Sequence, residues 1–297
     1  MRVNPNPLPD LLAALGVTQQ QINTDLAEIS SGQSVTVPSD NPGAAADLVQ
    51  NAAQTSVADQ FLRSLGSIQG EVANADSTLN SVTTALQSAI SLGVEGGNGP
   101  LNDSDRAAIV AEVQGIQTQL LSLANASYQG TYIFGGTKNQ AAPYVLDSTS
   151  PSGVTYVGNS GTNSVTLGNQ FRLQTNLPGS ELFSAPGTDV FQAIQDLITG
   201  LQSGTTTSIS TAVSELNNAA NYIDTQSVFY GNAESQLNSQ QTYLNTDTTQ
   251  LAQQQNTLGA ADLPAVITSL TSAETSHQAT LEAVAGISQT NLFSYLK

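Results

Sequence analysis

Apolar residues recur every three or four positions along about fifty residues from Ile209 to Leu258, the pattern of a long α-helix with an apolar stripe. One half of this heptad repeat stays apolar throughout, at Leu216, Ile223, Tyr230, Leu237, Leu244, Leu251 and Leu258. The other half is polar from Ser227 onward. Because so narrow a stripe buries little area within one chain, the pattern indicates a helix that needs partners, and it ends at Gly259.

Other stretches also predict helices. The first runs from about Leu8 to Ser31, and a longer one from Pro42 to about Leu92, where the glycine-rich run from Gly93 to Pro100 is expected to break it. Asn102 caps a third helix, and a short one follows Asp189 and stops at Gly204. A final helix begins after Pro264 and runs to Lys297. The predicted seam of the first helix is Leu8, Leu12, Leu15, Gln19, Ile22, Leu26 and Ile29.

The character of the sequence changes near Gln129, where Gly and Pro become frequent. Short alternating runs around Val154 and between Val165 and Leu173 are separated by Gly- and Asn-containing turns, so residues 140–184 are predicted to form a small β-rich module. The fold class is therefore mainly α: a bundle of long antiparallel helices, with the N- and C-terminal helices paired in a coiled coil and the β-rich insertion at the tip.

Composition excludes several functions. Six Lys and Arg against 23 Asp and Glu give a formal net charge of −17, which argues against binding nucleic acid or an anionic membrane surface. Cys is absent, so disulfides and thiolate chemistry are excluded. Nothing approaches the ~20 apolar residues of a membrane span, and no apolar signal segment is visible at the N-terminus. Aromatic residues make up 5% of the chain, few for the thick core of a compact enzyme.

Motifs that could carry chemistry are better explained by structure. The sole histidine, His277, has no nucleophile elbow to work with and is predicted to lie on a helix seam near Glu274. The run 130–137 has P-loop spacing but lacks the lysine, so we expect a strand and a tight turn. Asp103 and Asp105 are expected to cap a helix rather than bind calcium, and Asp40 with Asn41 to form a connector and cap. No catalytic, cofactor-binding or metal-binding residue is predicted.

Three segments together resemble the flagellin superfamily. The first helix ends in Ile29, Ser30, Ser31 and Gly32, and the connector reads Val37, Pro38, Ser39, Asp40, Asn41, Pro42 and Gly43. Residues 129–137 are similar to the turn that leads into the outer module of superfamily members found where the flagellar hook meets the filament, and residues 288–296 are similar to their terminus. One departure is Asn41, where the superfamily usually has a second Asp.

The resemblance implies a structural, non-enzymatic subunit of the bacterial flagellum that acts in motility. It would be secreted without a cleaved signal by type III export, guarded by a cytoplasmic export chaperone, and would assemble with itself, another hook-associated protein and flagellin at the extracellular junction of hook and filament. It implies an inner-tube domain of residues 1–41 with 260–297, a helical rod of 42–139 with 185–259, and an outer module of 140–184. No cofactor is implied.

The sequence alone leaves other functions open. The chain could be flagellin itself, the filament subunit, which the turn at Tyr132 to Thr137 disfavours; an enzyme on a helical scaffold or a cytosolic coiled-coil adaptor is a more distant possibility. We further predict that the terminal helices have no partner within the monomer and pair only in the assembled tube.

Overall fold

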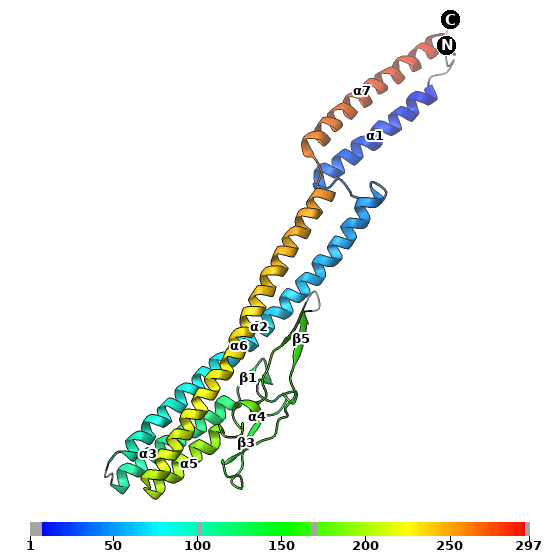
Figure 1. The fold of residues 1–297 in the computed structure, drawn as a ribbon. Helices are drawn as coiled ribbons and strands as arrows, with labels where there is room; N and C mark the ends of the chain where they lie inside the picture. The colour runs from blue at the N-terminus through cyan, green and yellow to red at the C-terminus, as the bar shows by residue number, and fades with distance from the viewer. Residues whose placement is uncertain (1–7, 100–101, 168–170, 295–297) are drawn as a thin grey trace. The chain divides into compact units, whose positions relative to one another are not determined.

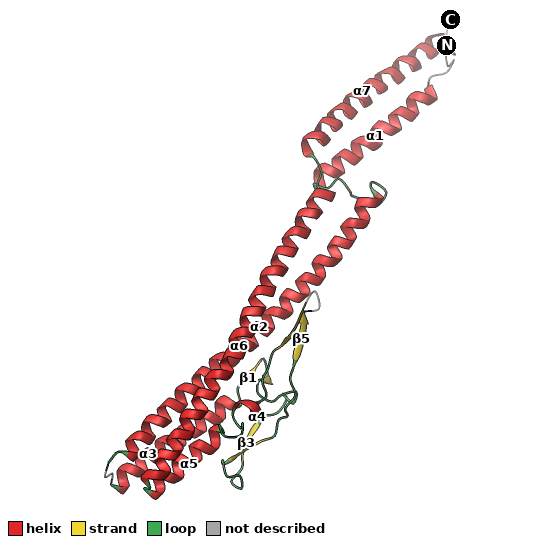
Figure 2. Ribbon diagram, in the orientation of Figure 1, coloured by secondary structure: helices red, strands yellow, loops and turns green. Residues whose placement is uncertain are grey.

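The computed structural model describes residues 8–99, 102–167 and 171–294, and long helices dominate it (Figures 1 and 2). The helices are α1 (Leu8–Ser31), α2 (Pro42–Gly97), α3 (Asp103–Ala124), α4 (Gly179–Leu182), α5 (Val190–Ser203), α6 (Thr206–Gly259) and α7 (Leu263–Ser294). The strands are β1 (Ser127–Tyr128), β2 (Thr131–Tyr132), β3 (Tyr144–Leu146), β4 (Val154–Tyr156), β5 (Ser164–Leu167) and β6 (Phe171–Gln174). The mainly α class with a small β module is confirmed.

The chain divides into two compact units. The terminal unit contains residues 1–57 and 246–297, and the central unit contains residues 58–245. Both α2 and α6 contribute one part to each unit, so the unit boundary falls inside these two helices.

The central unit has one continuous apolar core. Its helices bury an unbroken seam on α2, from Leu65 to Ala89, against α3, α5 and the first part of α6. The regular repeat of α6 supplies Leu216, Ile223, Tyr230, Leu237 and Leu244 to the same core. The half of the repeat that stays apolar is therefore the half that faces α2 and its neighbours.

The β module consists of three antiparallel two-stranded hairpins, β1–β2, β3–β4 and β5–β6. Two-stranded hairpins are marginal alone, and these are anchored on the helices by an aromatic cluster. The Tyr144 ring from β3 lies 5.1 Å from Phe191 of α5 and 5.9 Å from Phe183, and its hydroxyl donates to the Gly179 carbonyl at 2.7 Å. The module shares the core of its unit.

The expected place of the β module is corrected in one respect. Sequence reasoning put it at the tip of the helices, whereas the hairpins lie along the flank of the helices of the central unit (Figure 2). At the end of that unit lie the last turn of α2, the first turn of α3 and the turn between α5 and α6. The reason is that Tyr144, Val154 and Leu173 are apolar anchors that need a helix surface to cover them.

Helix ends follow the predicted signals except at one place. Asn102 caps α3, Asp189 caps α5, and Gly204 ends α5 with a φ of 67°. However, α2 continues to Gly97 instead of stopping near Leu92. A Cβ on Gly96 would lie 2.2 Å from the Leu201 side chain, so here glycine permits close helix packing and does not end the helix.

The terminal unit is built around two antiparallel helices, α1 and α7, which contact each other within one chain (Figure 1). They are tied at one end, where the Ser34 amide donates to the Gly259 carbonyl at 2.8 Å and the Ala261 amide donates to the Gly32 carbonyl at 3.0 Å. The predicted pairing of the terminal helices is therefore confirmed, but the expectation that they lack a partner inside the monomer is wrong. The predicted helix end at Leu296 and Lys297 lies outside the described residues.

Candidate assembly surface

The face that α1 turns toward α7 differs from the predicted seam. Thr24 and Glu28 are partly buried, and the other less exposed residues of α1 follow the three- and four-residue spacing of one seam: Leu8, Leu11, Leu15, Thr18, Ile22, Asp25 and Ile29. Leu12, Gln19 and Leu26, which the sequence pattern placed in the seam, are exposed instead. The apolar stripe of α1 is wider than one neighbouring helix can cover, so part of it overhangs the contact.

The matching face of α7 follows the same alternating spacing. It consists of Val266, Leu270, Ala273, His277, Thr280, Val284 and Ile287. His277 is thus one partly buried member of a helix–helix seam. Two of the seven residues are polar and one is Ala, so the seam is thin in the sense that it buries little apolar area.

Four large apolar side chains flank this seam and remain about half exposed. The exposed fractions are 51% for Leu12, 49% for Leu26, 52% for Ile267 and 46% for Leu281. Each of the four directly follows a seam residue, being one position after Leu11, Asp25, Val266 and Thr280 respectively. In an antiparallel helix pair, the residue directly after a given seam position on one helix lies on the same side of the pair as the residue directly after the equivalent seam position on the other helix.

The four side chains also fall at two levels along the pair. Gln33 and Ala260 are bridge partners at the tied end of the helices. Leu26 lies seven residues before Gln33, and Ile267 lies seven residues after Ala260, so these two side chains are at one level. Leu12 and Leu281 each lie fourteen residues farther from the tied end, at a second level. One face of the α1–α7 pair therefore presents two apolar pairs, Leu26 with Ile267 and Leu12 with Leu281. We call these four residues the overhang.

The terminal unit has almost no core of its own. Among its described residues, the buried apolar side chains are only Ala44, Leu251, Val266 and Ala273. Covering the exposed half of each overhang side chain would contribute roughly 1 kcal/mol, given about 1.5–3 kcal/mol for full burial of Leu or Ile. The unit therefore leaves apolar area exposed whose burial would stabilise it.

Asp25 weakens the α1–α7 seam. Its side chain is 3% exposed, and its Oδ1 accepts a hydrogen bond from Gln21 Nε2 at 2.9 Å. Its Oδ2 has no hydrogen-bond partner among the described residues. A buried carboxylate oxygen without a donor is costly, so this position opposes stable pairing.

The connector between α1 and α2 is ordered by Asp40 and Asn41. Asp40 Oδ2 accepts hydrogen bonds from the Val37 amide at 2.9 Å and from the amide and hydroxyl of Thr36 at 3.0 Å. The Val37 bond, with help from Thr36, holds the pKa of the exposed Asp40 carboxyl below its ordinary value. Asn41 Oδ1 accepts from the Ala44 amide at 3.1 Å and so caps α2, which explains how Asn serves where Asp is usual.

The other motifs of possible chemistry lie in a helix cap and in a turn. Asn102 Oδ1 accepts from the Asp105 amide at 2.8 Å, so Asp105 lies in a capped first turn. Within residues 130–137, strand β2 leads to a turn in which Gly136 has a φ of 71°, and the Thr137 amide donates to Asn159 Oδ1 at 2.8 Å. In the part of the chain that the structure describes, no group of three or more His, Cys, Asp or Glu is placed to hold a metal ion. The same residues include no helix long and apolar enough to cross a bilayer.

The fold and surface thus define a helical protein whose terminal helices pair and leave an apolar face open. Residues 10–139 match the family described as the bacterial flagellin N-terminal helical region. Over this part of the chain the protein is similar to the flagellin superfamily, in agreement with the resemblance of its sequence motifs.

Comparison with individual proteins shows which members of the superfamily this chain is similar to. Over 118 residues the chain is 40% identical to flagellar hook-associated protein 3 of Salmonella typhimurium, a stretch that covers 39% of this chain and 37% of that protein. Its fold is similar to a Vibrio parahaemolyticus structure assigned as a flagellar hook-associated protein (20% identity, TM-score 0.68, 74% of this chain and 99% of the other). It is also similar to flagellar hook-associated protein 3 of Legionella pneumophila (15% identity, TM-score 0.62, 71% and 98%). The resemblance to hook-associated protein 3 is confirmed, while the sequence match spans little more than a third of the curated relative.

Proposed function

We propose that this protein is a structural subunit of the bacterial flagellum that assembles with copies of itself at the junction between hook and filament. The observation that carries the proposal is the overhang: Leu12, Leu26, Ile267 and Leu281 form one open apolar face on a unit with almost no core. The names of the relatives, flagellar hook-associated protein 3, supply the place of assembly.

The proposal assigns roles to the parts of the chain. Residues 1–41 with 260–297 would form the inner-tube domain, residues 42–139 with 185–259 the helical rod, and residues 140–184 the outer module. The closely packed core of the central unit supports a rod that folds by itself, and the thin α1–α7 seam supports an inner domain completed by neighbours.

The proposal extends to partners and location. Neighbours in the flagellum would be other copies, another hook-associated protein and flagellin, and a cytoplasmic chaperone would cover the terminal helices before type III export to the extracellular junction. An exposed apolar face of this kind needs protection before assembly, because it favours aggregation. No enzymatic activity is proposed, since His277 lies in a helix seam.

Gene deletion and localisation test the proposal. Labelled antibody against the protein should mark the hook end of sheared flagella, and deletion should release monomeric flagellin into the medium. A deletion that leaves bare hooks with the junction proteins attached would instead identify the protein as the filament subunit. Finding the protein only inside the cell would contradict both roles.

A further inference from the structure

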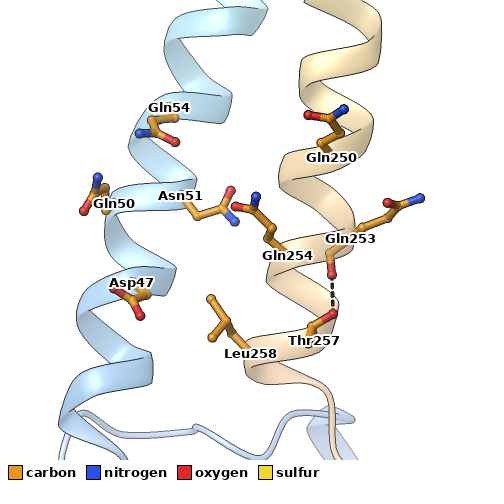
Figure 3. A pocket seen from close by; sticks show the side chains of 9 residues that line it. All are labelled: Asp47, Gln50, Asn51, Gln54, Gln250, Gln253, Gln254, Thr257 and Leu258. Atoms are coloured by element: carbon orange, nitrogen blue, oxygen red, sulfur yellow. Dashed lines mark hydrogen bonds between the residues drawn. The ribbon is translucent and has the colours of Figure 1, made fainter.

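A polar groove lies within the terminal unit between the first turns of α2 and the last turns of α6. Its volume is about 610 Å³, and it is lined by Asp47, Gln50, Asn51, Gln54, Gln250, Gln253, Gln254, Thr257 and Leu258. Figure 3 shows Asn51 and Gln254 pointing toward each other from the two helices. Glutamines form most of the rim, and they are exposed.

The floor of the groove contains an unsatisfied acceptor. Asn51 is 4% exposed, and its Nδ2 donates to the Leu251 carbonyl at 2.9 Å, which fixes the orientation of the amide. Its Oδ1 is buried and has no hydrogen-bond partner among the described residues. A buried acceptor without a donor costs free energy, so a group that brings donors here would be stabilised.

The lining also selects the charge of that group. Asp47 lies one helical turn before Asn51 on α2, so its carboxylate and the Asn51 oxygen share one face of the helix. No Lys or Arg is among the lining residues. Carboxamide oxygens and one carboxylate, without a competing cation, form a site for a donor-rich cation, and a guanidinium presents five N–H donors in a planar fork.

The chain itself offers an exposed guanidinium, that of Arg63. Arg63 is the only Lys or Arg on α2, and α1, α6 and α7 have none. Arg63 is exposed, and in the part of the chain that the structure describes it makes no hydrogen bond or ion pair. In a protein with a net charge of −17, neighbouring copies repel each other, so a contact between copies benefits where a cation meets an acceptor-lined groove.

We infer that the groove between α2 and α6 receives Arg63 of a second copy of this chain. The guanidinium pairs with the Asp47 carboxylate at the rim and, once the exposed Gln254 side chain swings aside, donates to Asn51 Oδ1. This contact rests on the proposed self-assembly and adds to the overhang a polar contact that fixes how adjacent copies are aligned.

A charge swap tests the inference. The variants D47K and R63D, and their combination, are expressed from the native gene, and the amount of this protein in isolated flagella is measured by quantitative immunoblot. Each single reversal is expected to lower that amount about tenfold, which corresponds to ~1.4 kcal/mol per contact. The combined variant should return to within about twofold of wild type, because the swapped charges attract again.

Controls separate this contact from general effects. E95K makes the same charge change at another exposed position of α2 and should leave incorporation unchanged. The milder D47N and R63Q should each give a smaller loss than the reversals, with unaltered thermal unfolding. Single reversals that incorporate like wild type, or a combined variant as defective as the singles, would overturn the inference while leaving the proposed function intact. Absence of the wild-type protein from isolated flagella would overturn the proposed function itself.

Discussion

The backbone amide of Leu177 donates a hydrogen bond to the hydroxyl of Tyr230 at 3.1 Å, and both residues are buried. This bond joins the segment that follows β6 to the middle of α6. Desolvation by burial raises the pKa of the Tyr230 hydroxyl well above its ordinary value, so the hydroxyl stays neutral. A tyrosine in the heptad repeat thus also anchors the β module.

Tyr230→Phe should therefore destabilise the central unit. The substitution keeps the ring but leaves the buried Leu177 amide without an acceptor, at a cost of about 1–3 kcal/mol. Urea unfolding followed by circular dichroism measures the loss. The control is Tyr222→Phe, whose hydroxyl donates to the Glu181 carbonyl at an exposed position and should cost less than about 1 kcal/mol. Equal losses in the free energy of unfolding for the two variants would show that the buried hydrogen bond stabilises the unit no more than the exposed one.

Glycine-to-alanine substitutions in α2 should have opposite effects at two positions. At Gly96 the added methyl would lie 2.2 Å from Leu201, so Gly96→Ala should destabilise the central unit by about 1–3 kcal/mol. At Gly66 nothing lies within 4 Å, so Gly66→Ala should stabilise it by about 0.5–1 kcal/mol. Thermal melts of the two variants test this, and a destabilised Gly66→Ala protein would contradict the packing described for α2.

The connector should lose order in acid. Hydrogen bonds from Val37 and Thr36 lower the pKa of Asp40 in the folded chain. Stability from a depressed carboxyl pKa is present above its unfolded value of about 3.9 and is lost as the pH falls through the folded pKa. Exchange of the Thr36 and Val37 amides, corrected for intrinsic rates, should accelerate below about pH 4. In Asp40→Ala it should be fast at every pH, and pH-independent protection in wild type would exclude this role for Asp40.

Asp25→Leu should strengthen the pairing of α1 with α7. The change removes a buried carboxylate whose Oδ2 has no donor among the described residues and adds apolar volume to the seam. Replacing such groups by apolar ones often stabilises by about 1–4 kcal/mol. Slower amide exchange along both helices is the expected readout, with the polar isostere Asp25→Asn as the matched control. Faster exchange in Asp25→Leu would mean that the carboxylate has a stabilising partner.

Loss of the overhang should abolish attachment without unfolding the rod. Leu26→Asp and Leu281→Asp each place a charge on the open apolar face, whereas the core of the central unit is untouched. Motility and immunoblots of isolated flagella should show loss of the protein, and near-native unfolding of the central unit serves as the control. Normal motility in both variants would argue strongly against assembly through this face.

Periodicity and capping residues predicted most of the fold. The bounds of α1 and the caps at Asn102, Asp189 and Gly204 could be read from local signals because each depends on neighbouring residues only. The end of α2 could not, because whether Gly96 ends a helix or admits a neighbour depends on Leu201, more than a hundred residues away. The side-on position of the hairpins likewise depends on distant contacts of Tyr144.

The assembly surface was predicted only in outline. The predicted seam of α1 and the observed one share Leu8, Leu15, Ile22 and Ile29 and differ in the remaining positions. Burial of Asp25 rather than Leu26 runs against residue hydrophobicity, so pattern reasoning chose the other seam. Sequence reasoning missed Asn51 although it stands in heptad register with Ala44, Ala58 and Leu65, because a polar residue in such a register is ordinarily expected to be exposed.

Amide hydrogen exchange of α1 and α7, compared between the free protein and intact flagella, tests the central claim most directly. The thin seam and the open overhang predict rapid exchange over residues 8–31 and 263–294 in the free chain, and strong protection once neighbours cover that face. Full protection of both helices in the free chain would contradict the account, because two helices that satisfy each other need no further partner.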